Sequence, residues 1–180
     1  MYEIIIYGRG GQGAKIGGEI IAKSALLEGK FIQAFPEYGP ERRGAPTTAF
    51  VRISDKEIRI HEPIKKPDCV IVLDDSVLEQ IQYKNCVGIV NTKNKKKIFK
   101  KTWCIDANKL SYDIFGRVIP NTVMMGGFVK ATSKIKLDSL LSVIKNIFGR
   151  KYNKEITDKN IELVKRGFNE ITEINSQQNN

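Results

Sequence analysis

The residues best suited to bind a ligand form a glycine-rich cluster near the N-terminus. The cluster consists of Gly8, Arg9, Gly10, Gly11, Gln12 and Gly13. Its first, third and sixth positions fit the pattern G-x-G-x-x-G, between an expected strand over residues 2–7 and an expected helix over residues 14–28. In this setting glycines let the backbone approach a phosphate, whose charge the helix N-terminus favours. These six residues are candidate cofactor-binding residues; the alternative is a tight turn that binds nothing.

The glycine pattern does not by itself indicate NAD. A dinucleotide site should also carry an acid at the end of the second strand, about 20 residues further along. The nearest acid is Glu37, which follows Gly13 by 24 residues and comes directly after Pro36. This position is late and lies in a stiff loop. A free-standing dinucleotide-binding protein therefore stays open as a weaker alternative.

The second candidate feature is the segment 35–46, which holds three prolines and two glycines. Its adjacent Arg42 and Arg43 are further candidate binding residues, because a guanidinium can fork onto a phosphate or carboxylate. Alternatively, both pair with Glu37 and Glu41. This segment and the glycine cluster each follow the carboxyl end of an expected strand. We therefore expect them to lie side by side at the edge where α/β sheets bind ligands.

Positive charge is the third feature. The chain has 30 Lys+Arg against 20 Asp+Glu, a net charge of +10. Six of the nine residues over 93–101 are lysines, and no acid occurs between Lys84 and Ile105. Such a segment could contact phosphates or an acidic partner, or could simply be solvated. Few aromatic residues accompany it, so we expect no nucleic-acid partner.

Residues for catalysis or metal binding are scarce. The three cysteines are spaced 17 and 18 apart without a CxxC pair, and there is one histidine. We expect no metal site, and reduced thiols of the kind found in cytoplasmic proteins. The best acid cluster is Asp74-Asp75, for which a helix-capping role is the alternative. The chain alone does not look like a complete enzyme, and no catalytic residue is assigned.

Alternating strand and helix patterns predict an α/β fold, a Rossmann-like three-layer sandwich whose sheet is mostly parallel with one antiparallel hairpin. The hairpin is expected from strands over 48–53 and 57–60. Buried strands are expected over 68–74, 86–90 and 102–105, and helices over 121–132, 137–148 and near the C-terminus. We expect one domain over residues 1–174 and a disordered tail over 175–180. No apolar run approaches the roughly 18 residues of a membrane span.

The motifs are similar to those of a known family. The glycine cluster, then Ala34-Phe35-Pro36 and the segment Glu41-Arg42-Arg43-Gly44-Ala45-Pro46, resemble the gamma subunits of the 2-oxoacid:ferredoxin oxidoreductases, and within them the pyruvate:ferredoxin oxidoreductase (pyruvate synthase) branch. The resemblance continues through 48–52, 67–72 and 121–126, and covers about residues 1–170.

The resemblance implies oxidative decarboxylation of pyruvate to acetyl-CoA and CO2 with reduction of ferredoxin. A branched-chain enzyme acting on 2-oxoisovalerate is the alternative. It further implies that alpha, beta and delta subunits carry thiamine diphosphate and the iron–sulfur clusters, and that coenzyme A is a substrate at a shared site. The glycine cluster and Arg42 or Arg43 would face coenzyme A phosphates or a neighbouring subunit. A cytoplasmic, membrane-free location is expected.

Overall fold

The structure, a computed structural model, describes residues 1–37 and 44–175. Arg42 and Arg43 lie outside the described residues, as do residues 176–180 of the expected tail. The described residues form one seven-stranded sheet in the order β2-β3-β1-β4-β5-β6-β7. The strands are β1 (Tyr2–Arg9), β2 (Phe31–Pro36), β3 (Pro46–Ser54), β4 (Cys69–Val72), β5 (Val87–Asn91), β6 (Lys101–Ile105) and β7 (Thr172–Ile174). The helices are α1 (Ala14–Leu27), α2 (Ala107–Phe115), α3 (Pro120–Thr132), α4 (Leu137–Lys151), α5 (Lys154–Glu170) and the 3-10 helix η1 (Asp75–Gln80).

The sheet is mostly parallel, as expected. Strands β1, β4, β5 and β6 pair in parallel, while β3 is antiparallel to both β1 and β2, and β7 is antiparallel to β6. Since two antiparallel pairings separate β2 from β1, these two strands run in the same direction. The unit formed by β1, α1 and β2 is therefore present with β3 inserted between its strands.

The antiparallel hairpin is present, but β2 and β3 form it. Residues 57–60, expected as its second strand, form no strand. The reason is that β3 is paired along both of its edges: Ile53 lies opposite Tyr2 on one side and Ile32 on the other. No edge of β3 is left for a strand that follows it.

Arg52 of β3 holds this inserted strand in place. Its side chain is only 2% exposed. Its Nε donates to Oε1 of Glu3 on β1 at 2.8 Å, and its Nη1 donates to Oε1 of Gln33 on β2 at 2.7 Å. Its Nη2 donates to the carbonyl oxygen of Glu62 at 2.7 Å, which fixes the segment after β3. A buried charge persists only when it is paired and hydrogen-bonded in this way.

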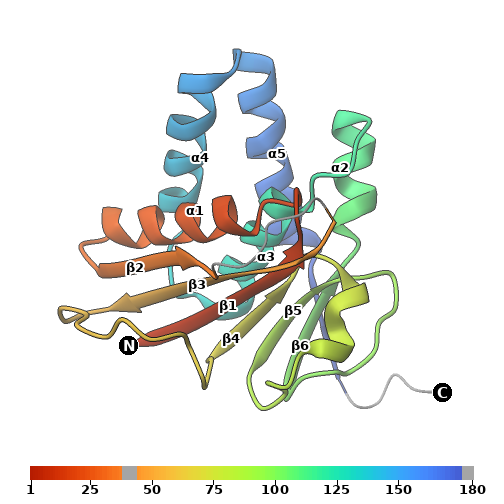
Figure 1. Ribbon diagram of the computed structural model, residues 1–180. Coiled ribbons are helices and arrows are strands. Elements are labelled where there is room, and N and C mark those ends of the chain that lie inside the picture. Colours follow the sequence, from red (N-terminus) through yellow and green to blue (C-terminus); the bar gives the residue numbers. More distant parts are fainter. Residues whose placement is uncertain (38–43, 176–180) are drawn as a thin grey trace.

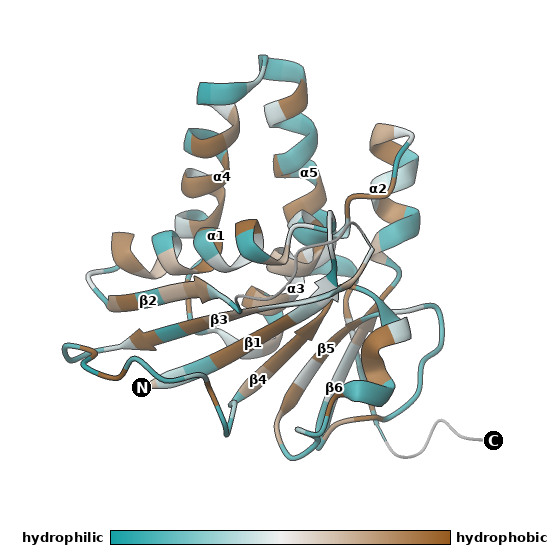
Figure 2. Ribbon diagram, viewed as in Figure 1, coloured by the Kyte–Doolittle hydropathy of each residue, from teal (hydrophilic) through white to brown (hydrophobic). Residues whose placement is uncertain are grey.

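The α-helices cover one face of the sheet (Figure 1). Alternate side chains of β1 serve different faces: Ile4 and Ile6 pack under the helices, whereas Ile5 packs on the opposite side. That second face is covered by η1 and by coil segments, through Val77 and Phe99 among others. The expected third layer is therefore thin. Figure 2 shows the hydrophobic central strands between the two coverings.

Helix α1 packs through small residues rather than through a continuous stripe of large apolar side chains. Ile20 is buried, but Ile16 is 47% and Leu27 is 63% exposed. Gly17 and Gly18 instead bring the helix close to the sheet, within contact of Ile6 on β1. This close approach buries a face centred on small residues.

Local propensity located most elements but not all of their ends. Helix α4 extends to Lys151 rather than ending at 148, and α3 begins at Pro120, one residue before its expected start. Neither α2 nor β7 was expected. In the described residues no helix is long and apolar enough to span a bilayer.

Helices α3 and α5 cross at two glycines. A Cβ added to Gly126 of α3 would lie 2.0 Å from the carbonyl oxygen of Val164 on α5. A Cβ added to Gly167 of α5 would likewise lie 2.0 Å from the carbonyl oxygen of Val123 on α3. Both contacts are with backbone, which cannot rotate away. The crossing therefore requires glycine at both positions.

We predict that Gly126→Ala lowers the free energy of unfolding by about 2 kcal/mol or more, because the methyl group forces the two helices apart. Gly149→Ala is the matched control: this helical glycine has nothing within 4 Å of an added Cβ. The control should raise stability by about 0.5–1 kcal/mol through helix propensity. Urea unfolding followed by circular dichroism measures both. Equal stability of the two variants would contradict the close crossing.

Candidate functional site

The glycine cluster forms a tight turn between β1 and α1. The amide of Gln12 donates to the carbonyl oxygen of Arg9 at 3.0 Å, and that of Gly17 donates to the carbonyl of Gly13 at 2.9 Å as α1 begins. Gly11 and Gly13 have φ values of 96° and 82°. The backbone of a residue that has a Cβ is strained in this left-handed region, so the turn depends on glycine at both positions.

The second candidate segment lies beside this turn, as expected. The amide of Gly10 donates to the carbonyl of Ala45 at 2.8 Å, and the amide of Gly44 donates to the carbonyl of Gly10 at 3.2 Å. The Nη1 of Arg9 adds a bond to the carbonyl of Gly44 at 3.0 Å. The described end of the 35–46 segment is therefore bound to the glycine turn. Candidates Arg42 and Arg43, just before it, lie outside the described residues.

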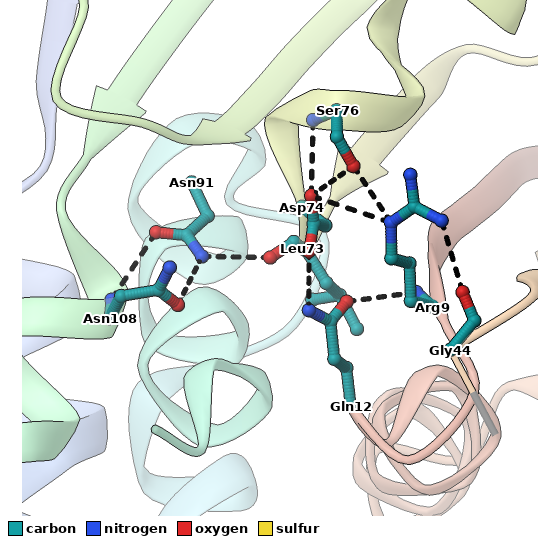
Figure 3. A network of polar contacts seen from close by, with 8 residues as sticks. All are labelled: Arg9, Gln12, Gly44, Leu73, Asp74, Ser76, Asn91 and Asn108. Atoms are coloured by element: carbon teal, nitrogen blue, oxygen red, sulfur yellow. Dashed lines mark hydrogen bonds and ion pairs between the residues drawn. The ribbon is translucent and has the colours of Figure 1, made fainter. Parts of the chain in front are cut away.

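Arg9 and Gln12 use their side chains to hold the turn against the end of β4 (Figure 3). The Oε1 of Gln12 accepts from the Arg9 amide at 2.8 Å, while its Nε2 donates to Oδ2 of Asp74 at 2.6 Å. The Nε of Arg9 donates to Oγ of Ser76 at 2.8 Å and lies 4.0 Å from Oδ1 of Asp74. These contacts give both residues a structural role in shaping the turn.

The acid cluster Asp74-Asp75 is also structural. Partial burial acts to raise the pKa of Asp74, but hydrogen bonds from Ser76 and Gln12 and the nearby charge of Arg9 lower it overall. Asp74 caps η1 by accepting from the amide of Ser76 at 3.0 Å. Asp75 accepts from Oγ1 of Thr92 at 2.8 Å. Asp74 thus stays an anion that orders the turn rather than a proton donor.

A second network, which the sequence did not indicate, extends this anchoring to α2. The Nδ2 of Asn91, at the end of β5, donates to the carbonyl of Leu73 at 2.7 Å and to Oδ1 of Asn108 at 2.8 Å (Figure 3). Its Oδ1 accepts from the Ala107 amide at 2.9 Å. The ends of β4 and β5 and the start of α2 are therefore fixed to one another.

The start of α1 remains open to an anion. The helix has no side-chain cap, and its first turn holds no acidic residue. Its first amide groups point toward the turn and carry the positive end of the helix dipole. Lys15, in the first turn, adds a positive charge that is exposed. The geometry of the glycine cluster thus suits a phosphate.

Asn121 is a site residue that the sequence did not single out. It lies at the start of α3 and is only 5% exposed. Its Nδ2 is 2.4 Å from the place where a Cβ on Gly13 would be. Its Oδ1 accepts from the Thr122 amide at 2.9 Å, but Nδ2 has no acceptor among residues 1–37 and 44–175. The Nδ2 donor of Asn121 therefore lies beside the uncapped N-terminus of α1.

The groups gathered at the glycine turn are suited to binding. The described residues contain no group of three or more potential metal ligands. All three cysteines are buried free thiols. Burial raises the pKa of Cys86 and of Cys104 to about 11, so both remain protonated at neutral pH. The arrangement is suited to a phosphate-bearing molecule.

Comparison with known proteins identifies the family. Residues 3–170 match the pyruvate ferredoxin/flavodoxin oxidoreductase family. The common gamma subunit of the pyruvate/ketoisovalerate oxidoreductases of Pyrococcus furiosus is 40% identical over 187 residues, which cover 97% of this chain and 98% of that protein. The pyruvate oxidoreductase subunit PORC of Thermotoga maritima superposes with a TM-score of 0.84 at 34% identity, over 97% of this chain and 98% of that one.

A more distant structure shares the fold. The 2-oxoglutarate:ferredoxin oxidoreductase of Magnetococcus marinus, solved with 2-oxoglutarate, coenzyme A and succinyl-CoA bound, has a TM-score of 0.79 at 19% identity, over 92% of this chain and 30% of that one. The two more similar proteins are complete subunits of nearly the same length. The chain therefore belongs to the pyruvate ferredoxin/flavodoxin oxidoreductase family, as a gamma-type subunit.

Proposed function

We propose that the chain is the gamma subunit of a complex that oxidatively decarboxylates pyruvate to acetyl-CoA and CO2 and reduces ferredoxin. The observation that carries this proposal is the full-length match to gamma subunits of pyruvate oxidoreductases. The name of the Pyrococcus protein describes one gamma subunit common to two oxidoreductases. Pyruvate and 2-oxoisovalerate enzymes are therefore compatible alternatives, since one such chain can belong to both.

The partners in this proposal are alpha, beta and delta subunits, with ferredoxin as electron acceptor in the cytoplasm. Thiamine diphosphate and the iron–sulfur clusters belong to those partners. This division is compatible with the described residues, which contain no group of three or more potential metal ligands. The chain contributes binding groups to a reaction whose electron transfer occurs elsewhere in the complex.

Coenzyme A is the molecule we assign to the glycine turn. It carries a diphosphate and a further phosphate, which match the uncapped start of α1. The Nδ2 of Asn121 supplies a hydrogen-bond donor at the same place. Arg42 and Arg43, which directly precede Gly44 beside the turn, would add charge. Coenzyme A bound in the distant Magnetococcus relative is consistent with this assignment.

We expect the tagged chain, purified from its own host without oxygen, to bring three further subunits with it. The complex should be brown from its iron–sulfur clusters and should reduce an electron acceptor with pyruvate and coenzyme A. Mass spectrometry, the visible spectrum and that assay measure the three properties. Activity only with branched 2-oxoacids would change the substrate. A colourless chain that purifies alone would refute the subunit assignment.

Asn121→Ala should raise the KM for coenzyme A by about tenfold or more, because a hydrogen bond to a charged group contributes about 1.5–3 kcal/mol. Since the reacting thioester is remote from the phosphates, kcat should change much less. Asn169→Ala, on the exposed face of α5, is the matched control and should leave the KM unchanged. Steady-state assays of the assembled complex measure both constants. An unchanged KM for coenzyme A in an intact Asn121→Ala complex would remove Asn121 from the site.

The double substitution Arg42→Ala and Arg43→Ala should also raise the KM for coenzyme A, through loss of positive charge beside the turn. Repeating the assay at higher salt should narrow the difference from the wild type, since screening weakens exposed charge interactions. Lys151→Ala with Lys154→Ala, in the described region at the end of α4 and the start of α5, removes the same charge elsewhere. If both double variants behave alike, only net charge matters and the two arginines make no specific contact.

A further inference from the structure

A well-defined hollow of the molecule lies away from the glycine turn. It is a pocket of about 380 Å³ at the carboxyl ends of β5 and β6, closed on its other side by the end of α5 and the start of β7. In the sheet order β1-β4-β5-β6, these strands lie two and three positions away from β1. Open α/β sheets bind ligands at this same edge. The volume is within the range of small-molecule sites.

The charge of this pocket is positive. Four cationic side chains line it, against two acidic ones: Lys93, Lys95, Lys109 and Arg166, with Asp106 and Glu170. The acids already have partners. Asp106 caps α2 by accepting from the Lys109 amide at 2.9 Å, and Glu170 is bound by Nε of Arg166 at 2.6 Å. The carboxylates of Asp106 and Glu170 are therefore already hydrogen-bonded within the pocket walls.

Lys93 and Lys95 are different, because within residues 1–37 and 44–175 neither ammonium group has an ion-pair partner. Both are exposed and belong to the hydrophilic connection between β5 and β6 (Figure 2). Lys109 joins Asp113 at 2.6 Å on the opposite wall. Two unpaired positive charges at a hollow favour an anionic ligand.

The floor of the pocket is apolar and unreactive. Ile105 and Leu110 line it and are each 6% exposed. Cys104 lies beside them; burial raises its pKa to about 11, an effect that the charge of Lys95 partly offsets. The thiol is therefore neutral at physiological pH and acts as a small apolar surface. A ligand here would rest an apolar body on this floor.

These features distinguish phosphate from carboxylate recognition. The guanidinium of Arg166 would suit a carboxylate, but Glu170 occupies its Nε and Nη2. The remaining cations are lysines, which act as point charges and bind a dianionic phosphate without a fixed fork. We propose that this pocket binds a small organic phosphate, with its apolar body on Ile105 and Leu110 and its phosphate between Lys93 and Lys95. The site is separate from the one assigned to coenzyme A.

Adenosine 5′-monophosphate is the probe, titrated into the purified full chain by isothermal titration calorimetry. We expect binding with a dissociation constant of about 1 mM or tighter. Lys93→Gln with Lys95→Gln should weaken it by about tenfold or more. The matched control is Lys96→Gln with Lys100→Gln, which removes the same charge from exposed lysines of the same connection that do not line the pocket. The control should change the affinity by less than about twofold, since these side chains do not line the pocket and salt screens exposed charges.

Four outcomes would overturn the proposal. The first is no binding of adenosine monophosphate at millimolar concentration. The second is equal weakening in both double variants, which would show a general effect of charge. The third is loss of binding in Asn121→Ala while the pocket variant binds as tightly as the wild type, which would place the phosphate at the glycine turn. Inorganic phosphate that binds as tightly as the nucleotide would refute the role of the apolar floor. Failure of coenzyme A kinetics to respond to Asn121→Ala bears on the other site alone.

Discussion

Close packing against glycines that lack a Cβ is the constraint on which the helical layer and the candidate site depend. Gly13 leaves room for the Asn121 amide, Gly17 leaves room for Met125, and Gly126 lies against the backbone of α5. Each contact exists because a Cβ is absent, since packed interiors leave no room for an extra methyl group. Together they bring the starts of α1 and α3 to one place. An uncapped helix N-terminus and a buried amide donor meet there as a result.

Polar and charged side chains also hold the glycine turn in place. Asp74 accepts a hydrogen bond from Gln12 and lies near Arg9, so the glycine turn is attached to the end of β4. Asn91 attaches the same strand end to α2. The anchoring groups are paired with one another, and this leaves backbone amides and the Asn121 amide for a ligand. Donors held in place in this way would bind the proposed phosphate without reordering the chain, which lowers the entropic cost of binding.

The proposed complex assigns binding and redox chemistry to different subunits. Among the described residues the three thiols are buried, and Asp74 and Asp75 are engaged in structural hydrogen bonds. In the complex proposed above, this chain would contribute substrate binding, and the reactive cofactors would belong to its partners. The full-length match to gamma subunits agrees with that role.

The sequence by itself determined the α/β class, the buried strands, the glycine turn and the placement of segment 35–46, through Gly44 and Ala45, beside that turn. These follow from local signals: apolar runs, glycine spacing, and the rule that parallel strands end at one edge. Only the tertiary structure decided that β3 lies between β1 and β2, because strand order depends on contacts such as that between Arg52 and Glu3, far apart in the chain. It alone placed Asn121 at Gly13 and opened the pocket beside Lys93 and Lys95. Such neighbours come from different elements, so no local pattern records them.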